Sequence, residues 1–235
     1  MIDKAVADLI LASPVFSGIP TREIEALVRV TRTAGYRSRE YIFMEGDSPL
    51  WLYVIKSGRV KILKHSRAGK DVVLELLQAG EIFGGVAVLE KRPYPAAAQA
   101  MEPTEVLKIP CDSVLVLSER HPSIVKEMAL MIGRRLRTAH ESIRSLAVEP
   151  VELRLAATLV RLADREGKRS GAGVELPYHL TRQTLANMAG TTVETTIRVV
   201  GRWIKEGLVA EDGWHLVLKK PEVLREMAIG ESETS

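Results

Sequence analysis

The hydrophobic pattern from about Tyr36 to Pro110 predicts β structure, because short apolar runs such as residues 51–55 alternate with turn residues. Four glycines follow one another at intervals of 12, 11 and 11 residues: Gly46, Gly58, Gly69 and Gly80. Turn residues at such even spacing are typical of a small antiparallel barrel or jelly roll. Ahead of this region, apolar residues at helical spacing predict a helix within residues 19–33 that packs on the barrel.

A different pattern begins at Pro122 and predicts one long helix that ends near Val148. Its apolar positions recur in alternating steps of four and three, and they are Val125, Ala129, Ile132, Leu136, Ala139, Ile143 and Leu146. We name these seven residues the seam. A narrow seam of this kind is typical of a helix that packs on a partner helix, which predicts a homodimer. The alternative is that the same face is buried against the protein's own barrel.

Glu149-Pro150 interrupts this helix, because a proline disfavours helical backbone at the residue before it, and we place a hinge there. The pattern then predicts a helix over residues 151–165 and a Gly/Ser-rich loop over residues 167–173. Two short helices and a hairpin follow. Asp212-Gly213 between two apolar runs is a strong hairpin signal.

The segment from Leu180 to Val209 has the pattern of a helix-turn-helix. Leu185, Ala186 and Ala189 give the first helix an inward face, and Gly190 permits a sharp turn. The second helix begins at a threonine cap, and the hairpin that follows it would form a wing. The sequence therefore predicts a winged helix-turn-helix whose second helix enters the DNA major groove.

Charge supports this interpretation through its distribution more than through its sum. The 235 residues carry a net charge of only +3. Within residues 182–205, however, four basic residues stand against Glu194 alone, and they are Arg182, Arg198, Arg202 and Lys205. We expect Arg182 and Arg202, together with the cap Thr192, to contact the DNA backbone.

Glu194 and Arg198 share one face of the second helix, since they are four residues apart. A carboxylate can accept a hydrogen bond from cytosine and a guanidinium can bind guanine, so the pair could read G·C base pairs. Two structural alternatives stay open. Thr191-x-x-Glu194 fits a capping box, and Glu194 with Arg198 fits an ordinary salt bridge on an exposed helix.

This helix-turn-helix closely resembles that of the Crp/Fnr family of bacterial transcription regulators. The order of barrel, long helix and hinge matches that family across nearly the whole chain. The resemblance implies an α+β fold with a cyclic-nucleotide-binding-like β-roll (1–120), a dimerisation helix with hinge (121–149) and a winged helix-turn-helix (150–235). Glu194 and Arg198 match two recognition positions of the family. Val193-Glu194-x-x-x-Arg198 is similar to the Fnr branch, although Ile197 replaces that branch's serine; Val193 and Ile197 would touch thymine methyl groups.

The stretch from Gly80 to Val86, followed by Tyr94-Pro95, resembles the family's phosphate-binding cassette. Members that bind cyclic nucleotides use a glutamate, an arginine and a serine, and the matching positions here are Gly85, Tyr94 and Pro95. None of the three carries a charge, so the sequence argues against cyclic AMP in the family's usual mode. An iron-sulfur cluster is excluded, because Cys111 is the only cysteine in the chain.

The remaining options for a signal are an apolar or aromatic ligand, a haem, a protein-level signal, or no effector. The resemblance places an effector pocket near Gly84, Gly85, Tyr94, Leu136 and His140. His140 is a candidate haem or ligand contact, and the alternative is an ordinary structural or solvated histidine. Cys111 is expected to be a small buried hydrophobe and not a redox switch.

The function expected from the sequence is that of a homodimeric regulator which binds double-stranded DNA at an inverted repeat. The resemblance also implies RNA polymerase as a partner. With no membrane span or leader in the sequence, we expect a cytoplasmic protein that does not contact a membrane. A haem-dependent gas or redox sensor of the same family is one alternative. A cupin-type metalloenzyme is another, but the histidines are scattered and no metal site or enzyme motif is evident.

Overall fold

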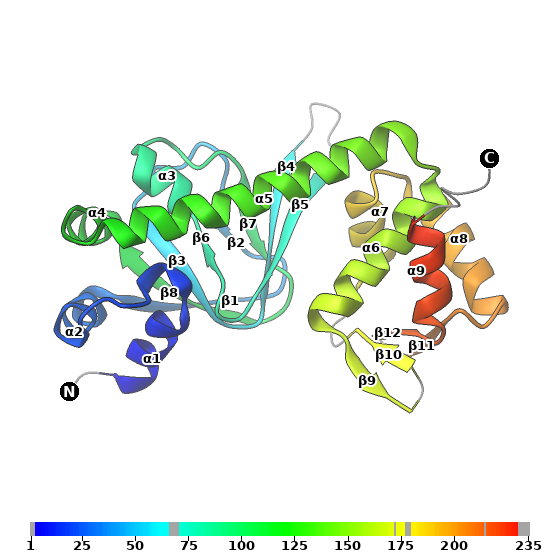
Figure 1. Cartoon of the computed structure of the whole chain (residues 1–235), viewed down its shortest axis with the longest axis horizontal. Coiled ribbons are helices and arrows are strands. Elements are labelled where there is room, and N and C mark those ends of the chain that lie inside the picture. Colours follow the sequence, from blue (N-terminus) through cyan, green and yellow to red (C-terminus); the bar gives the residue numbers. More distant parts are fainter. Residues whose placement is uncertain (1–2, 66–70, 172, 177–179, 214, 230–235) are drawn as a thin grey trace. The chain divides into compact units, whose positions relative to one another are not determined.

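The computed structural model describes residues 3–65, 71–171, 173–176, 180–213 and 215–229 (Figure 1). The chain divides into two compact units, Met1–Thr138 and Ala139–Ser235. The last turns of the long helix α5 (Pro122–Val148) therefore group with the C-terminal unit. The expected division at residues 120 and 149 stays a prediction.

The N-terminal unit is a β-roll of two four-stranded antiparallel sheets, which confirms the predicted jelly roll. In the first sheet the order is β1 (Arg32–Tyr36), β8 (Thr104–Pro110), β3 (Trp51–Ser57) and β6 (Ile82–Phe83). In the second it is β2 (Tyr41–Phe43), β7 (Ala97–Ala100), β4 (Arg59–His65) and β5 (Asp71–Gln78). Gly58 joins β3 to β4 with a φ of 83°, and a Cβ there would lie 2.5 Å from Thr104 Oγ1. Of the four evenly spaced glycines, Gly69 lies outside the described residues.

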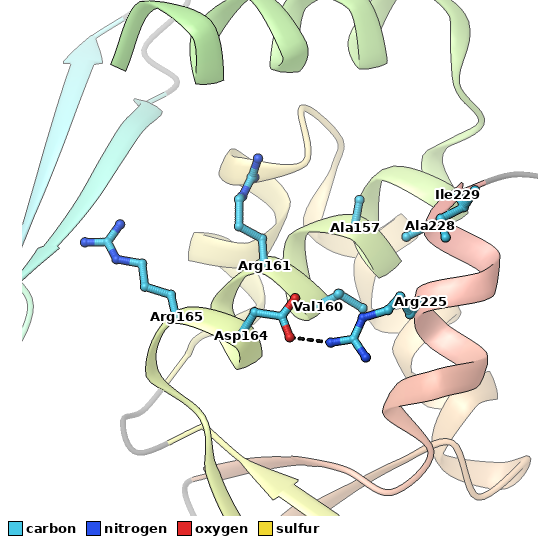
Figure 2. A pocket seen from close by; sticks show the side chains of 8 residues that line it. All are labelled: Ala157, Val160, Arg161, Asp164, Arg165, Arg225, Ala228 and Ile229. Atoms are coloured by element: carbon cyan, nitrogen blue, oxygen red, sulfur yellow. Dashed lines mark hydrogen bonds and ion pairs between the residues drawn. The ribbon is translucent and has the colours of Figure 1, made fainter. Parts of the chain in front are cut away.

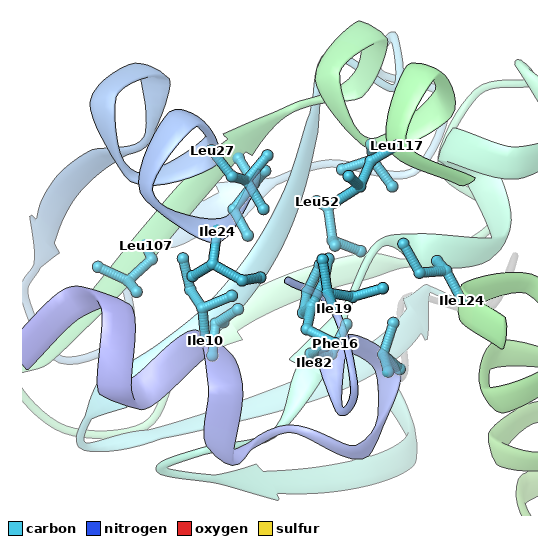
Figure 3. Packing of buried hydrophobic residues seen from close by; sticks show 14 of the residues in the cluster. Ile10, Phe16, Ile19, Ile24, Leu27, Leu52, Ile82, Leu107, Leu117 and Ile124 are labelled. Carbon is cyan, nitrogen blue, oxygen red and sulfur yellow. The ribbon is translucent and has the colours of Figure 1, made fainter. Parts of the chain in front are cut away.

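Helices cover the first sheet and close a hydrophobic core against it (Figure 3). They are α1 (Lys4–Ala12), α2 (Thr21–Val30), α3 (Gly85–Glu90) and α4 (Cys111–Arg120), with a 3-10 turn at Pro14–Phe16. The helix predicted within residues 19–33 is α2, and its Ile24 and Leu27 are buried in this core.

Helix α5 has the bounds that the sequence predicts, and it packs on the roll through a stripe other than the seam. Ile124 and Met128 are fully buried in the core of the N-terminal unit. Arg135 adds a polar anchor, since its Nε lies 2.9 Å from Glu75 Oε1 and its guanidinium donates to the Ile82 carbonyl. Six of the seven seam residues are exposed and Ile132 is half-buried. The seam is therefore not buried against the protein's own barrel.

The C-terminal unit combines helices that pack on one another with a small antiparallel sheet, which α8 contacts. The helices are α6 (Val151–Glu166), α7 (Arg182–Met188), α8 (Val193–Lys205) and α9 (Pro221–Ile229). The sheet has the order β11 (Val209–Asp212), β12 (His215–Leu218), β10 (Gly173–Glu175) and β9 (Lys168–Ser170). Helix α9 packs along α6, where Arg225 forms an ion pair with Asp164 beside an open groove (Figure 2).

In this unit one local expectation was wrong, and the expected hairpin was confirmed with its turn one residue later. The Gly/Ser-rich stretch 167–173 contains the edge strand β9, which pairs with β10 through Lys168–Glu175 and Ser170–Gly173. Gly173 makes this possible, because its φ is 130° and a Cβ there would lie 2.2 Å from the Leu218 carbonyl oxygen. The hairpin of β11 and β12 is present, but Asp212 pairs with His215 and so ends the strand instead of forming the turn.

None of the helices in the described ranges combines the length and the apolar character that crossing a membrane requires.

Candidate nucleic-acid interface and roll interior

Helices α7 and α8 form the predicted helix-turn-helix. The Thr181 side chain caps α7 by accepting a hydrogen bond from the Thr184 amide at 3.0 Å. Leu185, Ala186 and Ala189 are all buried, as their spacing predicts. Gly190 turns the chain with a φ of 61°, which favours glycine.

Helix α8 is held by one buried stripe, made of Thr196, Val199, Val200 and Trp203. Its cap is Thr192, whose hydroxyl accepts from the Thr195 amide at 3.2 Å. The alternative that Thr191 and Glu194 form a capping box was wrong, since the helix begins one residue later than that motif requires. Trp203 adds a polar contact at the back of the helix, where its Nε1 donates to Glu152 Oε1 at 3.2 Å.

The opposite face of α8 brings the four expected base-reading residues together near its N-terminus. Glu194, Ile197 and Arg198 are exposed and Val193 is half-buried. Ile197 has an exposed fraction of 55%, so its side chain is free to contact a partner. Within the described part of the chain, Glu194 and Arg198 do not pair with each other, so the salt-bridge alternative was wrong too.

The three expected backbone-contacting residues are all engaged within the protein. Arg182 forms an ion pair with Glu211 of the wing strand β11. Arg202 forms one with Glu152 of α6, and this hydrogen bond raises the pKa of the arginine above its ordinary value. The Thr192 hydroxyl caps α8 by accepting a hydrogen bond from the Thr195 amide. A phosphate would have to compete with a carboxylate at each arginine.

Aromatic side chains fill the interior of the β-roll at the place expected for an effector. The rings of Phe43 and Tyr94 stack with their centroids 3.8 Å apart, and those of Tyr53 and Phe83 stack at 4.9 Å. The Tyr94 hydroxyl donates to the Trp51 carbonyl at 2.6 Å and accepts from the Trp51 amide at 3.2 Å. Burial raises the pKa of this phenol, so it is neutral at physiological pH.

The cassette positions offer a cyclic phosphate no charged partner. Gly85 is buried, and a Cβ there would lie 3.2 Å from Leu52 Cδ1. Gly84 has a φ of 80° and approaches the Tyr94 ring so closely that a Cβ would lie 3.2 Å from Tyr94 Cε1. Pro95 is exposed and has no N–H to donate. These residues do not fit the binding mode in which a glutamate, an arginine and a serine hold the nucleotide.

The other residues of the expected effector pocket lie on α5. Leu136 belongs to the N-terminal unit and His140 to the C-terminal unit, and both are exposed. Cys111 is half-buried at the start of α4, and burial raises the pKa of its thiol. Within the described ranges, His, Cys, Asp and Glu residues do not gather in threes at any place that could hold a metal ion.

Two groups of residues that organise these sites do not follow from the sequence pattern. The aromatic cluster of the roll comes from four separate segments, so no local sequence pattern predicts it. Glu152 and Arg154 lie in the first turns of α6 and contact α7 and α8. The sequence did contain one signal for this site, which is Arg154. A cation near a helix N-terminus is unfavourable because it opposes the helix dipole, so its presence there indicates a role outside its own helix.

Comparisons with known proteins agree with both units. Residues 34–121 match the cyclic nucleotide-binding domain family, and residues 153–227 match the Crp-like helix-turn-helix domain family. The "Cyclic AMP receptor protein" of Thermus thermophilus is 30% identical over 218 residues, which cover 93% of this chain and 98% of the relative. The "Fumarate and nitrate reduction regulatory protein" of Escherichia coli K12 is 28% identical over 199 residues, covering 85% and 79%.

Among solved structures, FixK2 of Bradyrhizobium japonicum has a TM-score of 0.76 at 19% identity. The likeness covers 88% of this chain and 100% of FixK2, and it bears on the fold alone.

Proposed function

Because the chain belongs to the Crp/Fnr family of DNA-binding transcription regulators, we propose that it reads an inverted-repeat DNA site as a homodimer in the cytoplasm. The observation that carries this proposal is the exposed face of α8. Val193, Glu194, Ile197 and Arg198 lie together there, while the buried stripe on the other side fixes the helix. Exposed side chains near the N-terminus of a recognition helix are the ones that reach base edges in the major groove.

The DNA contact proposed for each residue follows from the chemistry of its side chain. Arg198 binds guanine, Glu194 accepts from cytosine, and Val193 and Ile197 contact thymine methyl groups. This set follows the Fnr branch, with Ile197 as the departure. Arg182 and Arg202 exchange their carboxylate partners for DNA phosphates, and the Thr192 hydroxyl lies beside the same backbone.

The exposed seam of α5 supports the homodimer. Leu136 and Ile143 have exposed fractions of 53% and 63%, and a second copy of the helix would bury them by knobs-into-holes packing. A two-fold dimer presents two recognition helices about 34 Å apart, one turn of DNA, and so requires an inverted repeat. RNA polymerase is the proposed partner of the DNA-bound dimer.

We propose further that the β-roll works without cyclic AMP. The aromatic cluster of Phe43, Tyr53, Phe83 and Tyr94 supports this, because these rings occupy the interior and their chemistry offers no cation for a phosphate.

The test is a selection of duplexes from a random inverted-repeat library with the wild-type protein, followed by binding titrations of Arg198→Ala. We expect this variant to lose about 1–3 kcal/mol on the selected site and to relax discrimination at one base pair in each half-site. The matched control is Lys205→Ala, which removes an exposed cation at the other end of α8 and should leave base discrimination unchanged.

Equal weakening on all duplexes by Arg198→Ala would show that this arginine does not read a base. If the wild-type protein retains no duplex at low ionic strength, the proposed function is wrong.

A further inference from the structure

Arg154 joins two helix ends that are far apart in the sequence. Its Nη1 donates to the Glu149 carbonyl at 2.6 Å, just beyond the end of α5. Its Nε donates to the Ala189 carbonyl at 2.9 Å and its Nη2 to the Gly190 carbonyl at 3.3 Å, at the turn between α7 and α8. One half-buried guanidinium therefore holds the end of the long helix and the turn of the helix-turn-helix together.

Helix electrostatics explains why an arginine suits this place. The last carbonyls of a helix lack partners within the helix and carry partial negative charge. Arg154 meets such carbonyls beyond the ends of both α5 and α7. A planar guanidinium offers several donors in fixed directions, so it can serve three carbonyls from one position.

Two neighbouring contacts tie the same region together. A Cβ on Gly190 would lie 2.2 Å from Leu146 Cδ2, so the last seam residue packs directly on the turn. Glu152, two residues before Arg154, accepts hydrogen bonds from Trp203 and Arg202 of α8. The first turns of α6 thus contact the residue that follows α5, the turn and the recognition helix.

We infer that Arg154 is a positioning residue that makes the last turns of α5 and the helix-turn-helix move as one body. This inference rests on the proposed function for its consequence, which is that Arg154 sets where each recognition helix stands relative to the seam. A dimer held together at the seam would then bind best to DNA whose two half-sites lie at one particular separation. Arg154 itself touches no base in this role.

The first experiment needs no DNA. Hydrogen exchange is measured on the full chain, free in solution, for the wild type, Arg154→Gln and the control Arg161→Gln. Arg161 is an exposed arginine about two turns further along α6. In Arg154→Gln we expect amide exchange to rise about tenfold in both residues 145–150 and residues 186–191, because both lose the same bridge. The control should match the wild type in these segments.

The second experiment measures binding to duplexes that carry the selected half-sites at different separations, and to a duplex with one half-site. The wild type should prefer one separation. Arg154→Gln should reduce that preference about tenfold, while its affinity for the single half-site stays the same. If Arg154 only stabilised the fold, Arg154→Gln would lower the fraction of active protein and would weaken binding to all the duplexes by the same factor.

The outcomes separate this inference from the proposed function. If exchange rises in only one of the two segments or in neither, or if the preference for one separation is unchanged, Arg154 does not couple them. If the wild type binds no duplex, the proposed function fails and hydrogen exchange alone decides the coupling. Should Arg154→Gln not fold, Arg154→Lys is measured by the same criteria, with smaller increases expected because charge is kept.

Discussion

Tyr94 is a buried side chain at the centre of the β-roll's aromatic cluster. Its ring stacks on Phe43, and its hydroxyl is satisfied by the Trp51 backbone. A neutral, buried phenol stabilises the roll from within and gives an anion no charged partner.

We predict that Tyr94→Ala destabilises the protein by about 3–5 kcal/mol, because it removes a stacked ring and leaves a cavity. Tyr94→Phe keeps the ring and loses only the hydroxyl contacts, so it should cost about 1 kcal/mol. Urea unfolding of both variants measures the difference. Added cyclic AMP should leave the wild-type melting temperature unchanged. Similar losses for the two variants, or a clear upward shift with cyclic AMP, would contradict this account of the roll.

Cys111 gives a prediction that depends on pH. Burial raises the pKa of its thiol, so at pH 8 a smaller fraction is thiolate than in an unfolded chain. Since the thiolate is the reactive form, we expect iodoacetamide to modify the folded protein more slowly than the protein in urea. The difference should narrow as pH rises above the raised pKa. Mass spectrometry follows the reaction at one site, because the chain has a single cysteine.

The elements that the sequence predicted best are those with local boundaries. Helix α5 runs from Pro122 to Val148 as expected, because a proline marks its start and Glu149-Pro150 ends it. Threonine caps and Gly190 likewise define the helix-turn-helix. Strand β9 was missed, since three exposed residues at a sheet edge carry no alternation to detect.

What the sequence could not predict depends on contacts between distant segments. The four rings inside the roll come from separate strands and loops, and their stacking exists only once both sheets close. The carboxylate partners of Arg182 and Arg202 lie on β11 and α6, so neither ion pair is local in the sequence. The resemblance to the family, and not periodicity, predicted which face of α8 is exposed, and neither predicted the contacts that orient the helix.

Alanine substitutions at two glycines of the helix-turn-helix should have opposite effects on stability. Gly190→Ala should destabilise the C-terminal unit by at least about 1–2 kcal/mol, because the residue has a φ of 61° and a Cβ would collide with Leu146. Gly201→Ala should stabilise it by about 0.5–1 kcal/mol, since Gly201 lies inside α8 with open space at the Cβ position. Thermal unfolding of the two variants tests the pair, and equal shifts would contradict the assigned roles.

At the scale of the whole molecule, α5 carries residues of both units. Its first turns are anchored in the β-roll by Ile124, Met128 and Arg135, and its last turns are held to the helix-turn-helix by Leu146 and Arg154. The seam runs along the exposed side of the same helix, and its last residue, Leu146, is also one of these contacts. Contact with a second copy would therefore act on a helix that is fixed at one end to the roll and at the other to the DNA-binding unit.

Ile143→Glu tests whether this seam is the dimer interface. Ile143 is 63% exposed, more than Val125, Leu136 or Leu146 of the same seam, so the substitution should leave the isolated chain folded. In a dimer it would place two like charges in an apolar contact, and we expect association to weaken about 100-fold or more. Sedimentation velocity measures this weakening directly.

The matched control is Arg134→Glu, which changes an exposed residue of the same helix outside the seam and should leave the dimer intact. DNA binding should fall with association, to the affinity of a single half-site, because one subunit presents one recognition helix. A variant that stays dimeric, or a monomer that binds the full inverted repeat as tightly as the wild type, would place the interface elsewhere.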